Sequence, residues 1–222
     1  MSAALREALC AASLTLERVG LNCGTAGNLS ARIDDGFLVT PSGVKPAALT
    51  SKAIVAMRLD GSLTDPRQQP SSEWRFHRDI YVARADAGAV VHVHSPYATA
   101  LACQRRDIPG FHYMIAKAGG DSIRCGDYAT FGTQELSDAA LVALVDRRAC
   151  LLANHGMIAL GATVDRAVDL TREVEELAKQ YALALMCGEP VLLSAAEMRD
   201  ALQRFKTYGA RNGQEQASPD GG

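Results

Sequence analysis

Hydrophobic and polar positions along the chain follow two patterns, one typical of helices and one typical of strands. Apolar residues recur at helical spacing over residues 3–19, which predicts an amphipathic helix that ends at Gly20. The same spacing over residues 163–187 predicts a second, longer helix. Further helices are expected where a serine or a proline precedes a periodic stretch, over residues 71–84, 96–103, 137–147 and 194–206.

Short apolar runs bounded by turn residues predict the strands. Residues 29–33 and 37–40 should pair as a hairpin across Asp35-Gly36, and other strands are expected over residues 54–59, 89–94 and 149–153. Helices and strands mix without a regular strand–helix–strand alternation. This favours a three-layer α/β arrangement around a largely antiparallel sheet. The polar stretch 212–222, which contains Gly and Pro, should be a disordered tail and leaves a single domain over residues 1–211.

Composition excludes several classes of protein. The 222 residues are 48% hydrophobic and carry a formal net charge of -2, so nothing in the charge favours binding to nucleic acid or to an anionic membrane. No apolar run approaches the roughly 20 residues that a membrane-spanning helix needs. The start of the chain does not resemble a secretory signal, and the six cysteines contain no C-x-x-C. We therefore expect reduced thiols and a cytoplasmic location.

Three of the five histidines stand in positions that suit a metal. His92 and His94 lie two residues apart in a predicted strand, so their rings share one face at a spacing of roughly 6.5–7 Å along the chain. Taken alone, this pair is better explained as polar residues on a solvated strand face. His155 shifts the balance, because it follows a strand of its own and precedes a glycine. Three imidazoles with an open fourth position are typical of a catalytic zinc site.

Glu73 is the obvious carboxylate partner of these histidines. The sequence places it in the first turn of a predicted helix, where the helix dipole favours its charge. It could bind the metal or act as a base, or it could simply cap the helix, and local sequence does not separate these roles. His77 lies four residues further along the same helix face. Glu73 and His77 could form a rival metal pair, but we favour a packing or hydrogen-bonding role for His77.

Small, polar, glycine-rich turns form a second group of candidate residues. Their backbone N–H groups and hydroxyls could together hold a phosphate, although each turn taken singly is most often just a turn. No P-loop and no strand-linked G-x-G-x-x-G is present, so nucleotide binding is not supported. The three turns are residues 24–28, residues 41–43 and the serine pair at 71–72.

The ordered set of these motifs resembles the class II aldolase/adducin family, and within it most closely the L-fuculose-1-phosphate aldolase branch. The resemblance covers nearly everything up to about residue 211 and is far more specific than any single motif. The matching stretches are GLNCGTAGNLSAR (20–32), VTPSGV (39–44), SSEWRFH (71–77), VVHVHSPYATA (90–100), HYMIAKAGGDSI (112–123), YATFGT (128–133), NHG (154–156) and FKTYG (205–209).

The resemblance implies an α/β/α fold with a central, mostly antiparallel sheet, and a homotetramer with active sites between subunits. It implies a lyase that reversibly cleaves a ketose 1-phosphate to dihydroxyacetone phosphate and an aldehyde. The ketose would be L-fuculose 1-phosphate or a related 5-deoxy- or 5-methylthio-pentulose 1-phosphate. A Lewis-acid metal that stabilises the charge developing on the ketose oxygens suits that reaction.

The resemblance also assigns roles to individual residues. Histidines matching His92, His94 and His155 bind one zinc ion per subunit, and the glutamate matching Glu73 binds zinc at rest and acts as acid and base. Tyrosines matching Tyr113 and Tyr208 reach the site, the first as proton donor to the aldehyde oxygen. The substrate phosphate is held by residues matching Gly27, Asn28, Ser42, Gly43, Ser71 and Ser72.

Several alternatives remain open at this point. The chain could be a sibling dehydratase, decarboxylase or 4-epimerase, although epimerases of the superfamily resemble this site with an aspartate in place of Glu73. A non-catalytic adducin-like scaffold is disfavoured because the histidines and Glu73 are all present. Nothing marks any lysine as the buried amine of a Schiff-base aldolase. The departures from the fuculose pattern are Ser42, Lys117, Asn154 and the stretch Ser95-Pro96-Tyr97, which follows the histidine pair as in the wider superfamily. Lys117, the neighbouring loop and the C-terminal region could change which aldehyde is accepted.

Overall fold

A seven-stranded sheet forms the centre of the molecule in the computed structural model, which describes residues 2–215 and the side chains of residues 3–206. The strands lie in the order β3-β2-β1-β4-β7-β6-β5. Every neighbouring pair is antiparallel except β5 and β6, which run parallel. The strands are β1 (Asn28–Ile33), β2 (Gly36–Val39), β3 (Val55–Arg58), β4 (Ala89–Val93), β5 (Arg124–Gly126), β6 (Ala149–Leu152) and β7 (Gly156–Gly161).

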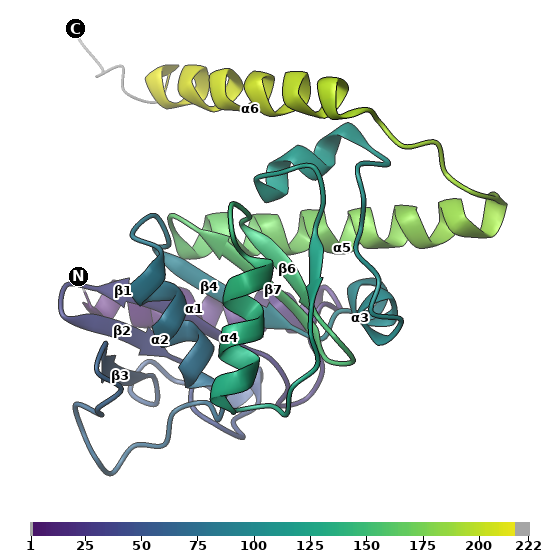
Figure 1. Cartoon of the computed structure of the whole chain (residues 1–222). Coiled ribbons are helices and arrows are strands. Elements are labelled where there is room, and N and C mark those ends of the chain that lie inside the picture. The colour runs from purple at the N-terminus through teal and green to yellow at the C-terminus, as the bar shows by residue number, and fades with distance from the viewer. Residues whose placement is uncertain (1, 216–222) are drawn as a thin grey trace, which may run out of the picture.

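Helices cover both faces of this sheet, as Figure 1 shows. Helices α1, α3 and α5 pack on one face, and α2 and α4 pack on the other. The helices are α1 (Ser2–Arg18), α2 (Trp74–Ala83), α3 (Pro96–Cys103), α4 (Gln134–Ala143), α5 (Val164–Cys187) and α6 (Ala195–Glu215), and two short 3₁₀ helices are η1 (Pro46–Ala48) and η2 (Tyr113–Ala118). Helix α6 packs against η2 and not against the sheet, and Figure 1 shows it apart from the sheet.

Side chains of the central strands alternate between two buried clusters, one on each face of the sheet. In β4, Val91 and Val93 enter the cluster beneath α1, α3 and α5, whereas Val90 enters the cluster beneath α2 and α4. His92 therefore lies on the second face, as the period of two in a strand requires. The register places Asn28 of β1 opposite His92. The fold thus brings a polar residue from each of two neighbouring strands to one point on the sheet.

The predicted fold class is confirmed by this arrangement of helices and a mostly antiparallel sheet. Two expected element starts were wrong. Helix α2 begins at Trp74 with Glu73 at its N-cap position and no capping bond from the Glu73 side chain, while Oγ of Ser71 accepts from the backbone N–H of Glu73 at 3.2 Å in the turn before the helix. Helix α4 begins at Gln134, because the side chain of Thr133 accepts a hydrogen bond from the backbone of Leu136 at 3.3 Å and caps the helix there.

Other differences concern short elements and the end of the chain. Strands β5 and β7 and the helix η2 were not predicted, because each is short or follows directly on another element. Helix α6 continues to Glu215, and the rest of the tail predicted from residue 212 lies outside the described residues. Within residues 2–215, no helix is both long and apolar enough to cross a bilayer.

Candidate metal centre and active site

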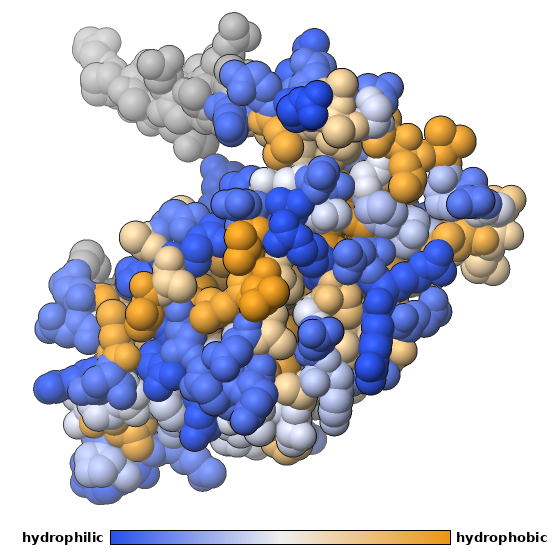
Figure 2. Space-filling model, in the orientation of Figure 1, coloured by the Kyte–Doolittle hydropathy of each residue, from blue (hydrophilic) through white to orange (hydrophobic). Residues whose placement is uncertain are grey.

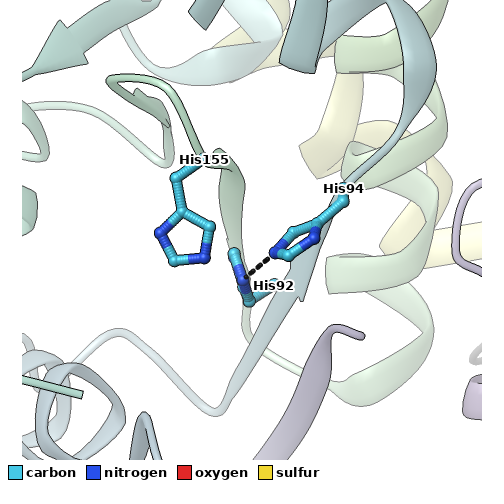
Figure 3. A group of neighbouring side chains, drawn as sticks. All are labelled: His92, His94 and His155. Carbon is cyan, nitrogen blue, oxygen red and sulfur yellow. Dashed lines mark hydrogen bonds between the residues drawn. The ribbon is translucent and has the colours of Figure 1, made fainter. Parts of the chain in front are cut away.

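The rings of His92, His94 and His155 converge at one point, as Figure 3 shows. His92 is the last residue but one of β4, His94 follows that strand directly, and His155 lies in the turn between β6 and β7. The ring centroids are 4.8–4.9 Å apart and the ring planes are inclined by 70–75°. The Nε2 atoms of His92 and His94 are 3.1 Å apart. Two nitrogens bound to one zinc ion in tetrahedral geometry lie about 3.4 Å apart, so the spacing suits a shared ion.

The hydrogen bond of His92 and the pKa values of His94 and His155 suit metal binding. Nδ1 of His92 donates to the backbone carbonyl of Met157 at 2.9 Å, which leaves the lone pair of Nε2 facing the cluster. Burial lowers the pKa of both His94 and His155 to about 4, and the neighbouring His92 contributes to the shift. Both rings are therefore neutral near neutral pH, the form in which imidazole binds a cation.

Glu73 lies beside the three rings and is almost fully buried. Its Oε2 is 3.3 Å from Nε2 of His92, and its Oε1 is 3.3 Å from Nε2 of His155. Oε1 makes no hydrogen bond within the described part of the chain. Burial opposes the negative charge, but His92, His155 and the Asn28 amide outweigh it and hold the pKa of Glu73 well below its ordinary value. A buried carboxylate oxygen without a hydrogen bond, next to three imidazoles, fits the donor set of a divalent cation.

His77 is not part of this cluster. Its ring is completely buried, with Nδ1 2.6 Å from Oγ of Ser30 and Nε2 2.6 Å from Oδ1 of Asn28. Burial lowers its pKa to about 3, followed by a smaller contribution from His92. The structure therefore gives His77 the hydrogen-bonding role that the sequence analysis favoured over a rival metal pair.

A cavity of about 300 Å³ opens above the histidines. Its lining combines Glu73, His94 and His155 with every residue that the family resemblance assigned to phosphate. Both glycines among them have a positive φ, 73° at Gly27 and 70° at Gly43. A Cβ at Gly27 would lie 2.8 Å from the backbone oxygen of His92. The close approach of this turn to β4 therefore requires a glycine at residue 27. The six residues that line this cavity and that the resemblance assigned to phosphate are Gly27, Asn28, Ser42, Gly43, Ser71 and Ser72.

The tyrosines are placed differently. Tyr113 is 53% exposed on η2 and stacks on Phe205 of α6 with ring centroids 6.2 Å apart. It lines a separate, more apolar cavity beneath α6 and does not line the histidine cavity of its own chain. The side chain of Tyr208 lies outside the described residues. Lys117 pairs with Glu173 at 2.8 Å and also lies away from the histidine cavity.

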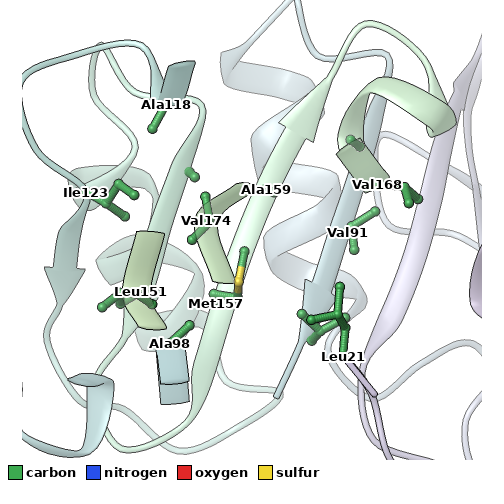
Figure 4. Close-up of a cluster of buried hydrophobic side chains, with 14 of the residues drawn as sticks. Leu21, Val91, Ala98, Ala118, Ile123, Leu151, Met157, Ala159, Val168 and Val174 are labelled. Carbon is green, nitrogen blue, oxygen red and sulfur yellow. The ribbon is translucent and has the colours of Figure 1, made fainter. Parts of the chain in front are cut away.

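Glu175 is a residue that the sequence analysis missed. Its buried carboxylate accepts hydrogen bonds from Oγ of Ser95 at 2.7 Å and from the backbone N–H groups of Tyr97 and Ala98, both at 2.9 Å. It therefore fixes the first turn of α3, which follows His94 directly. Val174, its neighbour in α5, belongs to the same buried cluster as Ala98 and Met157 (Figure 4). Only the helical period of α5 hinted at a buried face, and that pattern does not identify a partner 80 residues away.

We expect Glu175→Ala to lower the free energy of unfolding by about 3 kcal/mol, because it removes the acceptor of three donors, two of which belong to buried residues. Glu176→Ala, at the next and exposed position of the same helix, should change it by less than about 0.5 kcal/mol. Urea denaturation of both variants measures the difference. Equal stability of the two variants would contradict the anchoring role.

Comparisons with known proteins identify the family of this chain. Residues 7–182 match the family described as Class II Aldolase and Adducin N-terminal domain, and the chain belongs to this family. It is 56% identical over 206 residues to a 5-methylthioribulose-1-phosphate/5-deoxyribulose-1-phosphate aldolase of Rhodospirillum rubrum, covering 93% of each chain. It is 48% identical over 199 residues to L-fuculose phosphate aldolase of Escherichia coli, covering 89% of this chain and 92% of the relative.

Solved structures give the same result. A structure of L-fuculose 1-phosphate aldolase superposes with a TM-score of 0.88 at 40% sequence identity and covers 91% of this chain and 96% of its own. A putative aldolase/epimerase/decarboxylase of Klebsiella pneumoniae superposes with a TM-score of 0.81 at 31% identity and covers 90% of this chain and 99% of its own. Both the sequence and the fold therefore place the chain among the class II aldolases and their relatives.

Proposed function

We propose that this protein is a zinc-dependent class II aldolase that reversibly cleaves a ketose 1-phosphate to dihydroxyacetone phosphate and an aldehyde. The observation that carries the proposal is a single cavity. Its lining holds two of the three clustered imidazoles and the Glu73 carboxylate, one oxygen of which makes no hydrogen bond among the described residues. The same lining holds the glycine and serine turns suited to a phosphate. Names of relatives that cover nearly the whole chain support the same reaction.

His92, His94 and His155 would hold the zinc ion, with Glu73 as a fourth ligand at rest. When bound, the ion supplies Lewis-acid stabilisation of the charge that develops on the ketose oxygens. The donor set agrees with zinc because it combines neutral nitrogens with one carboxylate and no thiolate.

The side chains of the cavity supply the rest of the chemistry. The turns around Gly43 and Ser71 would bind the phosphate and fix the orientation of the substrate through contacts far from the reacting bond. In the condensation direction, Glu73 removes a proton from the hydroxymethyl carbon of dihydroxyacetone phosphate, and that carbon forms the new bond to the aldehyde carbon. A tyrosine then donates a proton to the aldehyde oxygen. In cleavage the same protons move in reverse.

That tyrosine would come from a neighbouring subunit. Tyr113 is exposed and lies on η2, outside the histidine cavity of its own chain. We therefore propose a homotetramer whose active sites lie between subunits, with Tyr113 and Tyr208 entering a partner's cavity. Two apolar residues at the end of α5 and just after it, Met186 and Val191, are 83% and 92% exposed, and Figure 2 shows hydrophobic patches on an otherwise largely hydrophilic face. Exposed apolar surface of this kind supports an oligomer. All six cysteines are unpaired, which supports a cytoplasmic location.

The aldehyde part of the substrate is expected to be short and apolar. The rim of the cavity carries two exposed aromatic residues, Tyr128 and Phe131, beside the polar floor. An apolar rim suits the methyl or methylthio end of a 5-deoxy- or 5-methylthio-pentulose 1-phosphate. The relative named for these two substrates is also more similar to this chain, at 56% identity, than the fuculose phosphate aldolase of Escherichia coli, at 48%.

A side-by-side rate comparison tests this proposal. The five substrates are the 1-phosphates of L-fuculose, L-rhamnulose, ribulose, 5-deoxyribulose and 5-methylthioribulose, and release of dihydroxyacetone phosphate is coupled to its reduction by NADH. We expect 5-methylthioribulose or 5-deoxyribulose 1-phosphate to give a kcat/KM at least about tenfold above the others, since a well-fitted apolar group contributes about 1–3 kcal/mol. No dihydroxyacetone phosphate from any substrate, or a product epimeric at C4, would contradict the aldolase assignment.

A further inference from the structure

Five polar side chains form a continuous, buried chain of hydrogen bonds that runs from the core of the domain to Glu73. The OH of Tyr81 is 2.8 Å from Oγ of Ser30, and that oxygen is 2.6 Å from Nδ1 of His77. Nε2 of His77 is 2.6 Å from Oδ1 of Asn28, whose Nδ2 is 2.9 Å from Oε2 of Glu73. All five residues are less than 9% exposed, so water does not compete for these bonds.

Two structural periods bring these residues together. Asn28 and Ser30 are two residues apart in β1 and so share one face of that strand. Glu73, His77 and Tyr81 are each four residues apart at the start of α2 and along it, and so share one face of that helix. Because α2 packs on this face of the sheet, the two rows meet side by side and each polar group finds a partner from the other row.

The direction of every bond in the chain follows from the charge of Glu73. An ionised carboxylate only accepts, so Asn28 must turn its amide nitrogen toward Glu73 and its oxygen toward His77. That oxygen also only accepts, so Nε2 of His77 must carry the ring proton. The ring is neutral, so Nδ1 must accept from the hydroxyl of Ser30. The oxygen of Ser30 is then free to accept from Tyr81.

We propose that His77 is a positioning residue for catalysis: its Nε2–H fixes the amide of Asn28 so that a donor always faces the Glu73 carboxylate. This role rests on the proposed aldolase function for its kinetic consequence. Without the donor on His77, the amide of Asn28 can rotate and present its oxygen to Glu73. Two acceptors would then face each other in a buried site, and the carboxylate would turn away or take up a proton. Glu73 could then neither hold a metal nor accept a substrate proton in its native geometry.

The protonation state of His77 can be measured without any substrate. In the zinc-loaded protein, two-bond ¹⁵N–¹H NMR correlations of the histidine rings distinguish the two neutral forms. We expect His77 to carry its proton on Nε2 and to keep it there across the pH range of activity. A proton on Nδ1 would reverse the direction of the hydrogen bonds that His77 makes with Ser30 and Asn28, and would overturn the proposal. Because this measurement needs no turnover, it separates a failure of the proposal from a failure of the aldolase assignment.

A pair of substitutions at His77 tests the kinetic consequence with the best substrate of the rate comparison. His77→Leu removes the donor at similar size, and we expect kcat to fall by about 10–100-fold with KM changed by less than about threefold. His77→Gln carries an amide nitrogen about as far from the backbone as Nε2, so it should restore kcat to within about threefold of the native value. Equal kcat for the Leu variant and the native protein, or no rescue by Gln, would overturn the proposal.

A second position covers the case in which His77→Leu does not fold. Ser30→Ala removes the hydroxyl that donates to Nδ1 but leaves Nε2 of His77 its acceptor on Asn28. We therefore expect the NMR spectrum to show mainly the Nε2–H form, and kcat to fall only by the share of molecules that carry the proton on Nδ1. Native kcat in a variant with the proton on Nδ1, or a loss of kcat by about tenfold with the proton on Nε2, would overturn the proposal.

Discussion

Removal of divalent metal with a chelator is expected to abolish ketose 1-phosphate cleavage, and added zinc or cobalt is expected to restore it. The rate should fall by at least about 1000-fold, because Lewis-acid stabilisation of the developing charge is worth several kcal/mol and each 1.4 kcal/mol is about tenfold. The three neutral rings and the unpaired oxygen of Glu73 are already arranged around one point. Restoration by metal should therefore not need refolding of the chain. Cleavage rate and zinc content by atomic emission, measured on the same samples, check this result.

A matched pair of histidine variants controls for unspecific effects. His94→Ala removes one ligand of the cluster and should lose most bound zinc. His112→Asn changes a histidine outside the cluster and keeps an acceptor for the backbone of Met114, so it should keep one zinc per subunit. Cleavage that survives chelation and is trapped by borohydride would instead indicate a lysine Schiff base. The ion pair between Lys117 and Glu173 gives no support to that route.

The histidine cluster could be predicted from sequence because its members follow simple periods. His92 and His94 differ by two in a strand, and His155 stands between a strand and a glycine. Those local patterns correctly placed three side chains near the ends of neighbouring strands. They did not show that β7 begins directly after His155, and this strand pairs with β4 to bring the third ring to the other two. That step depends on pairing between distant segments, which local pattern does not encode.

Tertiary contacts, and not local helix propensity, determine where the carboxylate of Glu73 lies. Local propensity placed this residue in the first turn of a serine-capped helix, but the structure places it at the N-cap, where its own side chain makes no capping bond. Contacts with Asn28 and with the histidine rings hold its carboxylate in the cavity. The position of a buried charge of this kind is decided by partners far away in the sequence, such as Asn28 at 45 residues and His155 at 82 residues. The same holds for Glu175, whose three hydrogen bonds cross from α5 to α3.

The phosphate residues were predicted through the family resemblance, and the structure brings all six into one cavity with the histidines. Their individual roles remain proposals, and the structure adds a second role for one of them. Asn28 lines the cavity but also joins Glu73 to His77. No sequence period links Asn28 to His77, because the two lie on different elements. Only the packing of α2 on β1 and its neighbours creates that contact.

Glu73→Gln is expected to lower kcat by about 100–10,000-fold while the protein keeps its fold, because general acid–base groups contribute rate factors of this size. The glutamine oxygen can still accept the bond from Asn28, so the buried chain to His77 stays satisfied. The lost function is proton removal from the hydroxymethyl carbon, since an amide is not a useful base. Zinc content should fall less than activity, because three imidazoles remain. Steady-state kinetics, far-UV circular dichroism and zinc content measured on the same preparation check these expectations.

The matched control for this substitution is Glu135→Gln. Glu135 also stands at the start of a helix, in the first turn of α4, but it is exposed and does not line the cavity. Its loss should leave kcat within about twofold and cost less than about 1 kcal/mol of stability, as expected for a carboxylate near an exposed helix N-terminus. If Glu73→Gln behaved like Glu135→Gln, the carboxylate would be a helix-start residue without a proton-transfer role. A selective loss at Glu73 instead is expected from its burial beside the three rings, where under the proposed function one carboxylate would serve both metal binding and proton transfer.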